Sequence, residues 1–108
     1  MESQKASSDA SPESNCDVNF AFLTGTVSAD IDVGTTGQGS KCATMLLRVD
    51  QKRSIIVRVN AYERTADYIE DFSEGDRVMV RGELITRLAR GGVSVTEIKA
   101  HVVSRLTA

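Results

Sequence analysis

The stretch "VNAYERTADYIEDFSEGDRVMVRGEL", from Val59 to Leu84, constrains the fold most, because it places one short helix between two β-branched strands. The runs at its two ends alternate apolar and polar residues, as half-buried strands do. The middle segment instead repeats its apolar residues at helical spacing, which predicts a helix from about Glu63 to Phe72 with one apolar face. That face consists of Thr65, Ile69 and Phe72. Any fold assigned to the chain must therefore use a single helix between two particular strands.

The rest of the chain predicts five strands separated by turn-rich links. Glycine-rich loops are expected at 30–40 and 87–92, and Gly75 accepts a positive φ that can end the helix. Five antiparallel strands with a helix between the third and the fourth form the plan of the OB fold, an all-β Greek-key barrel whose open end the helix closes. The expected strands are, in chain order, Asn19–Ala29, Lys41–Asp50, Ser54–Tyr62, Arg77–Thr86 and Val93–Leu106.

The first 17 residues, "MESQKASSDASPESNCD", differ in composition from the residues that follow. They are rich in serine, contain the only proline, and carry four acidic residues against one lysine. Such a segment has too little apolar surface to form a core, so residues 1–17 are predicted to be a flexible tail and residues 18–108 one OB-fold domain. The domain then holds 12 basic and 11 acidic residues, so any binding of nucleic acid must come from the local placement of its charges.

The residue types that catalysis and metal binding need are sparse and scattered. The chain has one histidine, His101, and two cysteines, Cys16 and Cys42, with no CxxC pair and no cluster of ligands. A metal site, a cofactor and an enzyme activity are therefore not expected. No segment has the roughly 18 apolar residues of a membrane span, and the N-terminus has no apolar signal region, so a cytoplasmic protein is expected.

Alternation along the expected strands divides each of them into an inward and an outward face. The outward face combines arginine and lysine with a few apolar or aromatic residues, a mixture typical of surfaces that bind single-stranded nucleic acid. Taken alone, an ordinary solvated sheet face is the simpler explanation of the pattern. The residues expected inside are Ala43, Met45, Leu47, Val49, Ile55, Val57, Val59, Val78, Val80, Leu84, Ile98, Ala100 and Val102; those expected outside include Thr44, Leu46, Arg48, Ile56, Arg58, Asn60, Tyr62, Lys99 and His101.

Four stretches resemble bacterial single-stranded DNA-binding proteins. They are "VNFAFLTGTVSAD" in the first strand, "CATMLLRV" in the second, "VNAYERTADYIEDFSEGDRVMVRGEL" around the helix, and "VTEIKA" in the last strand. The third is the most specific, because it contains the pattern Gly-Asp-x-Val-x-Val-x-Gly, and the four together cover most of residues 18–104. The resemblance implies an OB fold that binds single-stranded DNA without sequence preference, with no catalysis and no cofactor.

The resemblance also implies which residues contact DNA, since the family stacks bases on aromatic side chains and follows phosphates with basic ones. Tyr62 matches a stacking position, whereas Ile56 stands where the third strand would usually offer another. The chain has no tryptophan, and its link between the second and third strands is shorter than the family's DNA-holding hairpin. The expected contacts with single-stranded DNA are Arg48, Lys52, Arg53, Ile56, Arg58, Tyr62, Arg87 and Arg90.

Assembly and partners follow from the same resemblance, because family members are usually tetramers or paired-domain dimers. Phe20 and Phe22 share the outer face of the first strand, which the family commonly uses to join subunits. A homo-oligomer, either dimer or tetramer, with these two residues in its interface is therefore expected. The resemblance further implies a nucleoid-associated role in replication, recombination or repair, with replication or repair proteins as partners.

Two alternatives stay open. The first is an OB-fold accessory subunit that acts mainly through protein contacts, as in a primosome, and shows a broad apolar patch where a DNA binder shows a continuous basic groove. The second is an RNA-binding domain of the cold-shock type, whose aromatic-rich strand motifs are missing from this chain.

Overall fold

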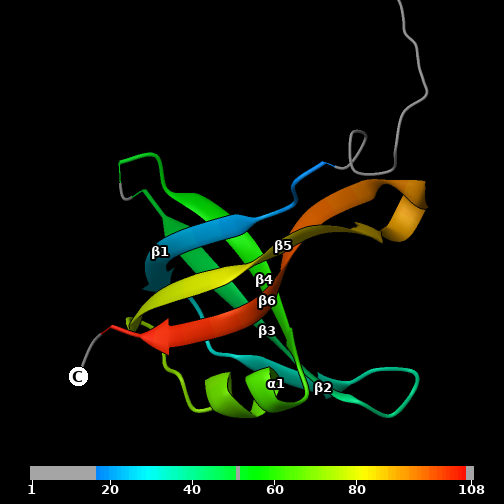
Figure 1. The fold of residues 1–108 in the computed structure, drawn as a ribbon, viewed down its shortest axis with the longest axis horizontal. Helices are drawn as coiled ribbons and strands as arrows, with labels where there is room; N and C mark the ends of the chain where they lie inside the picture. Colours follow the sequence, from blue (N-terminus) through cyan, green and yellow to red (C-terminus); the bar gives the residue numbers. More distant parts are fainter. Residues whose placement is uncertain (1–16, 51, 107–108) are drawn as a thin grey trace, which may run out of the picture.

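The computed structural model describes residues 17–50 and 52–106, which form a small β-barrel with one short helix (Figure 1). Residues 1–16 of the predicted tail lie outside the described residues. Within the described part, no helix is long and apolar enough to cross a membrane. The elements are β1 (Ala21–Val27), β2 (Asp32–Thr35), β3 (Lys41–Val49), β4 (Ile55–Tyr62), α1 (Arg64–Ile69), β5 (Arg77–Leu88), the 3-10 turn η2 (Arg90–Gly92) and β6 (Ser94–Arg105).

The strands form one sheet in the order β1-β5-β6-β4-β3-β2, and this sheet closes into a barrel because β1 also pairs with β3. The closing pairs are Thr26 with Arg48 and Val27 with Leu47. β4 and β6 run parallel, whereas the other pairings are antiparallel. This arrangement, with α1 between the third and fourth of the five expected strands, confirms the predicted all-β OB fold.

Alternate residues of the barrel strands point into one core, which α1 covers at one end (Figure 1). Burial of one such aliphatic side chain stabilises the fold by about 1.5–3 kcal/mol. Ile55, which alternation places inside, is 45% exposed because it begins β4 beside the β3–β4 turn, at the edge of the barrel. The buried core consists of Val27, Ala43, Met45, Leu47, Val59, Ala61, Ala66, Ile69, Phe72, Val78, Val80, Ile98, Ala100 and Val103.

The helix is shorter than predicted. It ends at Ile69, and residues 70 and 71 form a turn that brings Phe72 back to the core. Ile69 and Phe72 are buried as expected, and Ala66 is buried beside them. Gly75 has a positive φ of 97°, but it lies in the turn before β5 and does not end the helix. Its N–H donates to the carbonyl of Val27 at 2.8 Å, so it joins the loop to the barrel.

A sixth strand, β2, lies in the segment 30–40 that the sequence predicts to be a loop. Its four residues pair with the first half of β3, so the two strands form a hairpin. The turn of this hairpin is held by Thr36, whose Oγ1 accepts the N–H groups of Gln38 at 3.3 Å and Ser40 at 3.1 Å. All four residues of β2 are exposed, so the strand has no inward and outward face from which it could be recognised.

β5 and β6 form a second, longer hairpin (Figure 1). β5 continues to Leu88, two residues further than predicted, and Gly91 and Gly92 take the positive φ values of the turn at the tip. Leu84 is expected inside but is 51% exposed. The reason is that β1 pairs with β5 only as far as Gly82, so Leu84 has a neighbouring strand on one side only, where Ile98 of β6 lies opposite it.

A β-bulge interrupts the alternation of β6. The register of the two strands shifts between Arg81 and Gly82 of β5, which leaves His101 of β6 without a directly opposite residue. The inward and outward positions exchange beyond this point. Val103 is therefore buried in place of Val102, which the sequence predicts inside and which is only half-buried.

Candidate nucleic-acid interface

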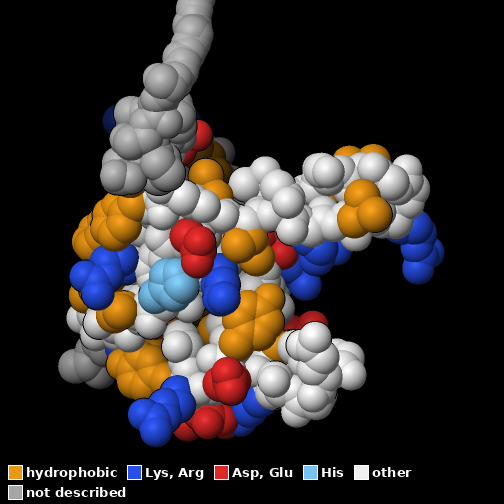
Figure 2. Space-filling view, turned by 45° about the vertical axis from the view of Figure 1, so that its right-hand side comes forward, with side chains coloured by type: hydrophobic (Ala, Val, Ile, Leu, Met, Phe, Trp, Pro, Cys, Tyr) orange, Lys and Arg blue, Asp and Glu red, His pale blue; other side chains and the backbone are white. Residues whose placement is uncertain are grey.

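Two hairpins project from the barrel (Figure 1), and the space-filling view shows a hollow between them (Figure 2). The β5–β6 hairpin forms the upper lobe on the right of Figure 2 and the β2–β3 hairpin the lower lobe, with Lys and Arg side chains beneath the upper lobe. Along the sheet, β6, β4 and β3 come between β5 and β2. We call the outward faces of β3, β4 and β6, together with the inner sides of the two hairpins, the groove.

The floor of the groove consists of side chains that lie opposite one another on β3 and β4. Opposite residues of an antiparallel pair point to the same face of the sheet, so the register decides which side chains meet. Four predicted contacts, Arg48, Ile56, Arg58 and Tyr62, therefore share this face, as alternation predicts. From the β3–β4 turn toward the β2–β3 hairpin, the opposite pairs are Arg48 and Ile56, Leu46 and Arg58, Thr44 and Asn60, and Cys42 and Tyr62.

Glu97 of β6 joins two of the predicted arginines, which come from different strands. Glu97 is only 1% exposed, although it lies on the outward face of β6. Arg87 donates from Nε to Glu97 Oε2 at 2.7 Å, and its Nη2 lies 2.7 Å from the same oxygen. Arg58 Nε lies 3.3 Å from that oxygen, and Asn60 Nδ2 donates to Oε1 at 2.6 Å. We call Arg58, Asn60, Arg87 and Glu97 the Glu97 cluster.

The electrostatics of the Glu97 cluster keep its carboxylate ionised. Burial acts to raise the pKa of Glu97, but the hydrogen bonds from Asn60 and Arg87 and the charges of Arg87 and Arg58 hold its pKa below the ordinary 4.5. Two guanidinium groups and one carboxylate give the cluster a net charge of +1 at neutral pH. The arginine side chains are still 43% and 47% exposed, so N–H groups that do not face Glu97 can reach a ligand.

A small cavity of about 250 Å³ lies where the floor meets the β2–β3 hairpin. Tyr62 is half-buried in one wall, and Lys99 Nζ lies 5.8 Å from the centroid of its ring. An aromatic face beside a cation, next to an open space, suits a flat ring such as a nucleobase. The remaining walls are polar and consist of Thr36, Gln38, Ser40 and Glu63.

The other three predicted contacts lie at the edges of the groove rather than on its floor. Lys52 and Arg53 belong to the turn between β3 and β4, where Arg53 Nε is 3.6 Å from a carboxylate oxygen of Asp50. Arg90 belongs to η2, at the tip of the β5–β6 hairpin. The structure therefore brings Arg58 and Arg87 into one cluster and leaves these three basic residues outside it.

Of the predicted interface residues, Phe20 lies just before β1 and Phe22 lies within it, and they are 61% and 56% exposed. Asn19 anchors this segment to β5, because its Oδ1 accepts the N–H of Leu84 and its Nδ2 donates to the Leu84 carbonyl, both at 2.8 Å. Phe22 lies opposite Arg81 of β5. Two exposed aromatic rings on such an anchored segment are typical of an interaction surface.

Sequence reasoning missed Glu97 as part of the site. Alternation places it outside, one residue before the inward Ile98, and outward glutamates are ordinarily exposed. Its burial depends on Arg58 and Arg87, which lie 39 and 10 residues before it in the chain. Only the pairing of β6 with both β4 and β5 brings the three residues together. Asn60 and Lys99 were expected on the outward face, but their contacts with Glu97 and Tyr62 could not be predicted without that register.

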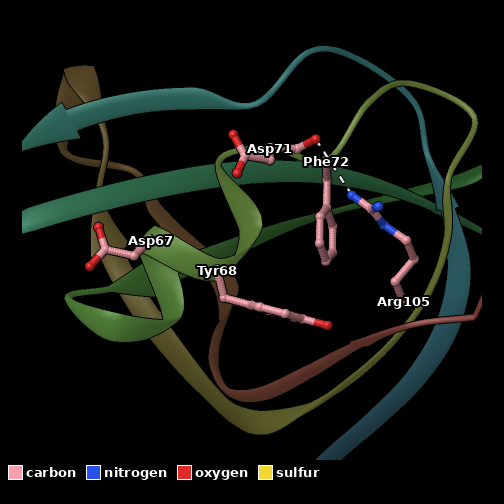
Figure 3. Close-up of a pocket in the computed structure, with 5 residues that line it drawn as sticks. All are labelled: Asp67, Tyr68, Asp71, Phe72 and Arg105. Carbon is pink, nitrogen blue, oxygen red and sulfur yellow. Dashed lines mark hydrogen bonds between the residues drawn. The ribbon is translucent and has the colours of Figure 1, made fainter.

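A second cavity, of about 350 Å³, lies between α1 and the end of β6 (Figure 3). The guanidinium of Arg105 lies 4.5 Å from the centroid of the Phe72 ring, and its Nη2 donates to the Asp71 carbonyl at 3.5 Å. Tyr68 packs edge-on against Phe72 with their centroids 5.3 Å apart. These contacts fasten the end of β6 to the helix, so we interpret them as structural. Among the described residues, no group of His, Cys, Asp and Glu side chains could hold a metal ion.

Solved structures with a similar fold include two forms of one single-stranded DNA binding protein. The wild-type protein from Thermus aquaticus matches with a TM-score of 0.74 and 25% identity, over 84% of this chain and 41% of that chain. A deletion mutant of that protein gives a TM-score of 0.74 and 24% identity, over 84% and 42%. This chain thus spans about two fifths of their length. No family model and no curated protein matches its sequence. The likeness confirms the relationship in fold that the four sequence stretches indicated.

Proposed function

We propose that this chain binds single-stranded DNA without sequence preference, through the groove between its two hairpins. The observation that supports the proposal is the structural likeness, over 84% of the chain, to a protein whose name states that it binds single-stranded DNA. OB folds hold oligonucleotides against the outward face of their central strands and between the loops beside it. In this chain that face is the groove floor, which carries both basic and aromatic side chains.

In this proposal the phosphates of the strand lie along the basic residues of the groove. Arg58 and Arg87 stand side by side at its centre and keep exposed N–H groups for a phosphate. Arg48 belongs to the same floor, Lys52 and Arg53 extend the basic surface past the β3–β4 turn, and Arg90 reaches it from the tip of the β5–β6 hairpin. Because each neutralised phosphate releases counterions, binding should weaken with salt by a logarithmic slope of about −0.7 per contact.

Tyr62 supplies the stacking surface. Its ring forms a wall of the 250 Å³ cavity, and the polar groups around that cavity can accommodate the edge of a base. Ile56, which is 48% exposed on the same floor, can contact a second base through its apolar surface. Stacking on one aromatic ring contributes about 1–3 kcal/mol per base. Because the chain has no tryptophan, phosphate contacts should provide most of the affinity.

The wider role belongs to the same proposal. A protein that covers single strands non-specifically protects or organises DNA during replication, recombination or repair, and it does so without an active site or a cofactor. We place the protein in the cytoplasm with the nucleoid, as a homo-oligomer that uses the surface around Phe20 and Phe22. These two exposed rings, two residues apart at the beginning of β1, are the observation that supports assembly.

The same two rings favour one competing function, that of an OB-fold accessory subunit that acts through protein contacts. In that case the surface that binds the partner protein is formed by the exposed phenylalanines and not by the groove. The two functions differ in where substitutions act. Changes at Arg58 and Tyr62 should weaken function only if the groove binds DNA, whereas in an accessory subunit a change at Phe22 should weaken it.

Fluorescence anisotropy with labelled oligo-dT at 50 and 200 mM salt tests the proposal, with a duplex of equal length as the control. We expect saturable binding of the single strand that falls steeply with salt, and weaker binding of the duplex. Equal and weak binding of both nucleic acids would reject the proposal and leave the accessory subunit in its place.

A further inference from the structure

The buried carboxylate of Glu97 is unexpected in a surface that binds phosphates. It lies within 3.3 Å of a nitrogen of both Arg58 and Arg87, so a phosphate that approaches either guanidinium must also approach a negative charge. The proposed function uses the two arginines and gives Glu97 no role. The question is therefore what a carboxylate contributes at the centre of this groove.

Stability alone is a weak explanation for the ion pairs. Glu97 is 1% exposed, so the cost of removing its carboxylate from water offsets much of the attraction that the two guanidinium groups return. The arginines do not need Glu97 in order to be solvated, because each is nearly half-exposed. Asn60 and Arg87 donate hydrogen bonds to Glu97, and Arg58 forms an ion pair with it. Asn60 is itself held by Thr44 Oγ1, which donates to Asn60 Oδ1 at 3.2 Å. The carboxylate is thus fixed in place by groups on three strands.

We infer that Glu97 is a positioning residue that limits the positive charge of the groove, holding Arg58 and Arg87 in place while cancelling one of their two charges. A phosphate then meets two ordered guanidinium groups with a combined charge of +1 instead of +2. The strand is bound less tightly than the number of arginines suggests, and its binding depends less on salt. This inference rests on the proposed function, since it concerns the affinity of the same groove.

The test is Glu97→Gln, which keeps the length of the side chain and removes its charge. Salt titrations with oligo-dT should show tighter binding at 50 mM salt and a logarithmic slope steeper by about 0.7, the value of one further phosphate contact on a single strand. Between 50 and 200 mM salt, this added slope corresponds to a further loss of affinity of roughly 2.6-fold. A residue with only a structural role would leave the slope unchanged or make it shallower.

Glu74→Gln is the matched control, because Glu74 is exposed in the turn before β5, outside the groove. It removes the same charge from the protein and should leave the slope unchanged. The effect of Glu97→Gln should also disappear in a background that carries Arg58→Ala and Arg87→Ala, since Glu97 acts through these two residues. Circular dichroism establishes that each variant is folded at the temperature of the titration. If Glu97→Gln does not fold, Glu97→Met makes the same change of charge and takes its place.

The outcomes separate the inference from the proposed function. If the wild-type protein does not bind oligo-dT, the proposed function fails and the inference fails with it. If the wild-type protein binds, but Glu97→Gln binds with an equal or shallower slope, the inference alone is overturned. Equal steepening by Glu74→Gln would also overturn it, because net charge rather than position would then explain the result.

Discussion

Lys99 Nζ lies 5.8 Å from the centroid of the Tyr62 ring, at the end of the groove where the β2–β3 hairpin meets the floor. The two residues come from β6 and β4, the parallel pair of the sheet. In the proposed function, such a cation beside an aromatic face would place a phosphate contact next to a stacking surface. Substitutions at Tyr62 and in the Glu97 cluster should therefore differ in their effect on the salt dependence of DNA binding.

Arg58→Ala and Tyr62→Ala should change DNA binding in different ways. Loss of Arg58 should weaken binding of all sequences and make the salt slope shallower by about 0.7, because one phosphate contact is lost. Loss of Tyr62 should cost about 1–3 kcal/mol and leave the slope nearly unchanged, because stacking releases no counterions. Salt titrations by anisotropy measure both quantities.

The controls for this pair are Arg64→Ala, which removes an exposed arginine from α1, and Tyr62→Phe, which keeps the ring. Both should bind like the wild type. An identical change of slope for the Arg58 and Tyr62 variants would show that the two residues do not have the separate roles proposed.

Glu97→Gln should lower stability at neutral pH, and the loss should shrink in acid. The pKa of Glu97 is lower in the folded protein than its ordinary value of 4.5. The ionised carboxylate therefore contributes stability that is fully present above pH 4.5 and is lost as the pH falls through the folded pKa. We expect a difference of about 1.5–3 kcal/mol at pH 7, the scale of hydrogen bonds to a charged group.

Urea unfolding of both proteins from pH 7 down to pH 3 measures this difference. Other carboxylates titrate in both proteins alike, so the gap between the two curves isolates Glu97. A gap that stays constant or widens in acid contradicts the assignment.

Gly82→Ala should destabilise the barrel. A Cβ on Gly82 would lie 2.0 Å from the carbonyl oxygen of Lys99, and backbone atoms of β6 cannot withdraw without breaking the pairing beside the bulge. We expect the free energy of unfolding to fall by about 1–3 kcal/mol, as for other overpacked sites. Gly34→Ala is the control, because the nearest atom there, Cys42 Sγ, lies at an ordinary 3.8 Å. Thermal unfolding that places both variants at the same midpoint would refute the prediction.

Phe22→Asp should convert the protein to monomers if the surface around Phe20 and Phe22 joins subunits. A charge at a position that is 56% exposed in one chain disturbs the fold little, but it would be buried without a partner in the interface. Light scattering at micromolar concentration gives the mass. Val33→Asp, an equal change at an exposed apolar residue of β2, should leave the mass unchanged. A monomeric wild type would exclude the interface.

The barrel strands and the position of the helix could be predicted from the sequence because their signals are local. Alternation identifies β3 as a strand with Ala43, Met45 and Leu47 inside, and one helical stripe identifies α1. The extent of the two hairpins could not be predicted in this way. β2 has no buried face, and the ends of β5 and β6 continue past the core, so strand pairing rather than burial in the core defines these residues as strands.

The candidate site was predictable only in part for a related reason. Period-two alternation places Arg48, Arg58 and Tyr62 on one face, because this requires only that β3 and β4 are strands. It does not reveal that Arg58 and Arg87 share the carboxylate of Glu97. That contact depends on which strands are neighbours and on their register, and both are set by the closure of the whole barrel.

The bulge at His101 has a consequence for comparing this chain with its relatives. One added residue lets β6 keep Ile98 and Ala100 inside before the bulge and Val103 inside after it. A relative that lacks the bulge would have the same hydrophobic pattern shortened by one residue. An alignment without a gap that is anchored on the residues after the bulge would then match Glu97 to an inward position, and the carboxylate would look like an unrelated substitution. Gaps at this point should therefore be placed from superposed backbones before residues on either side of the bulge are compared.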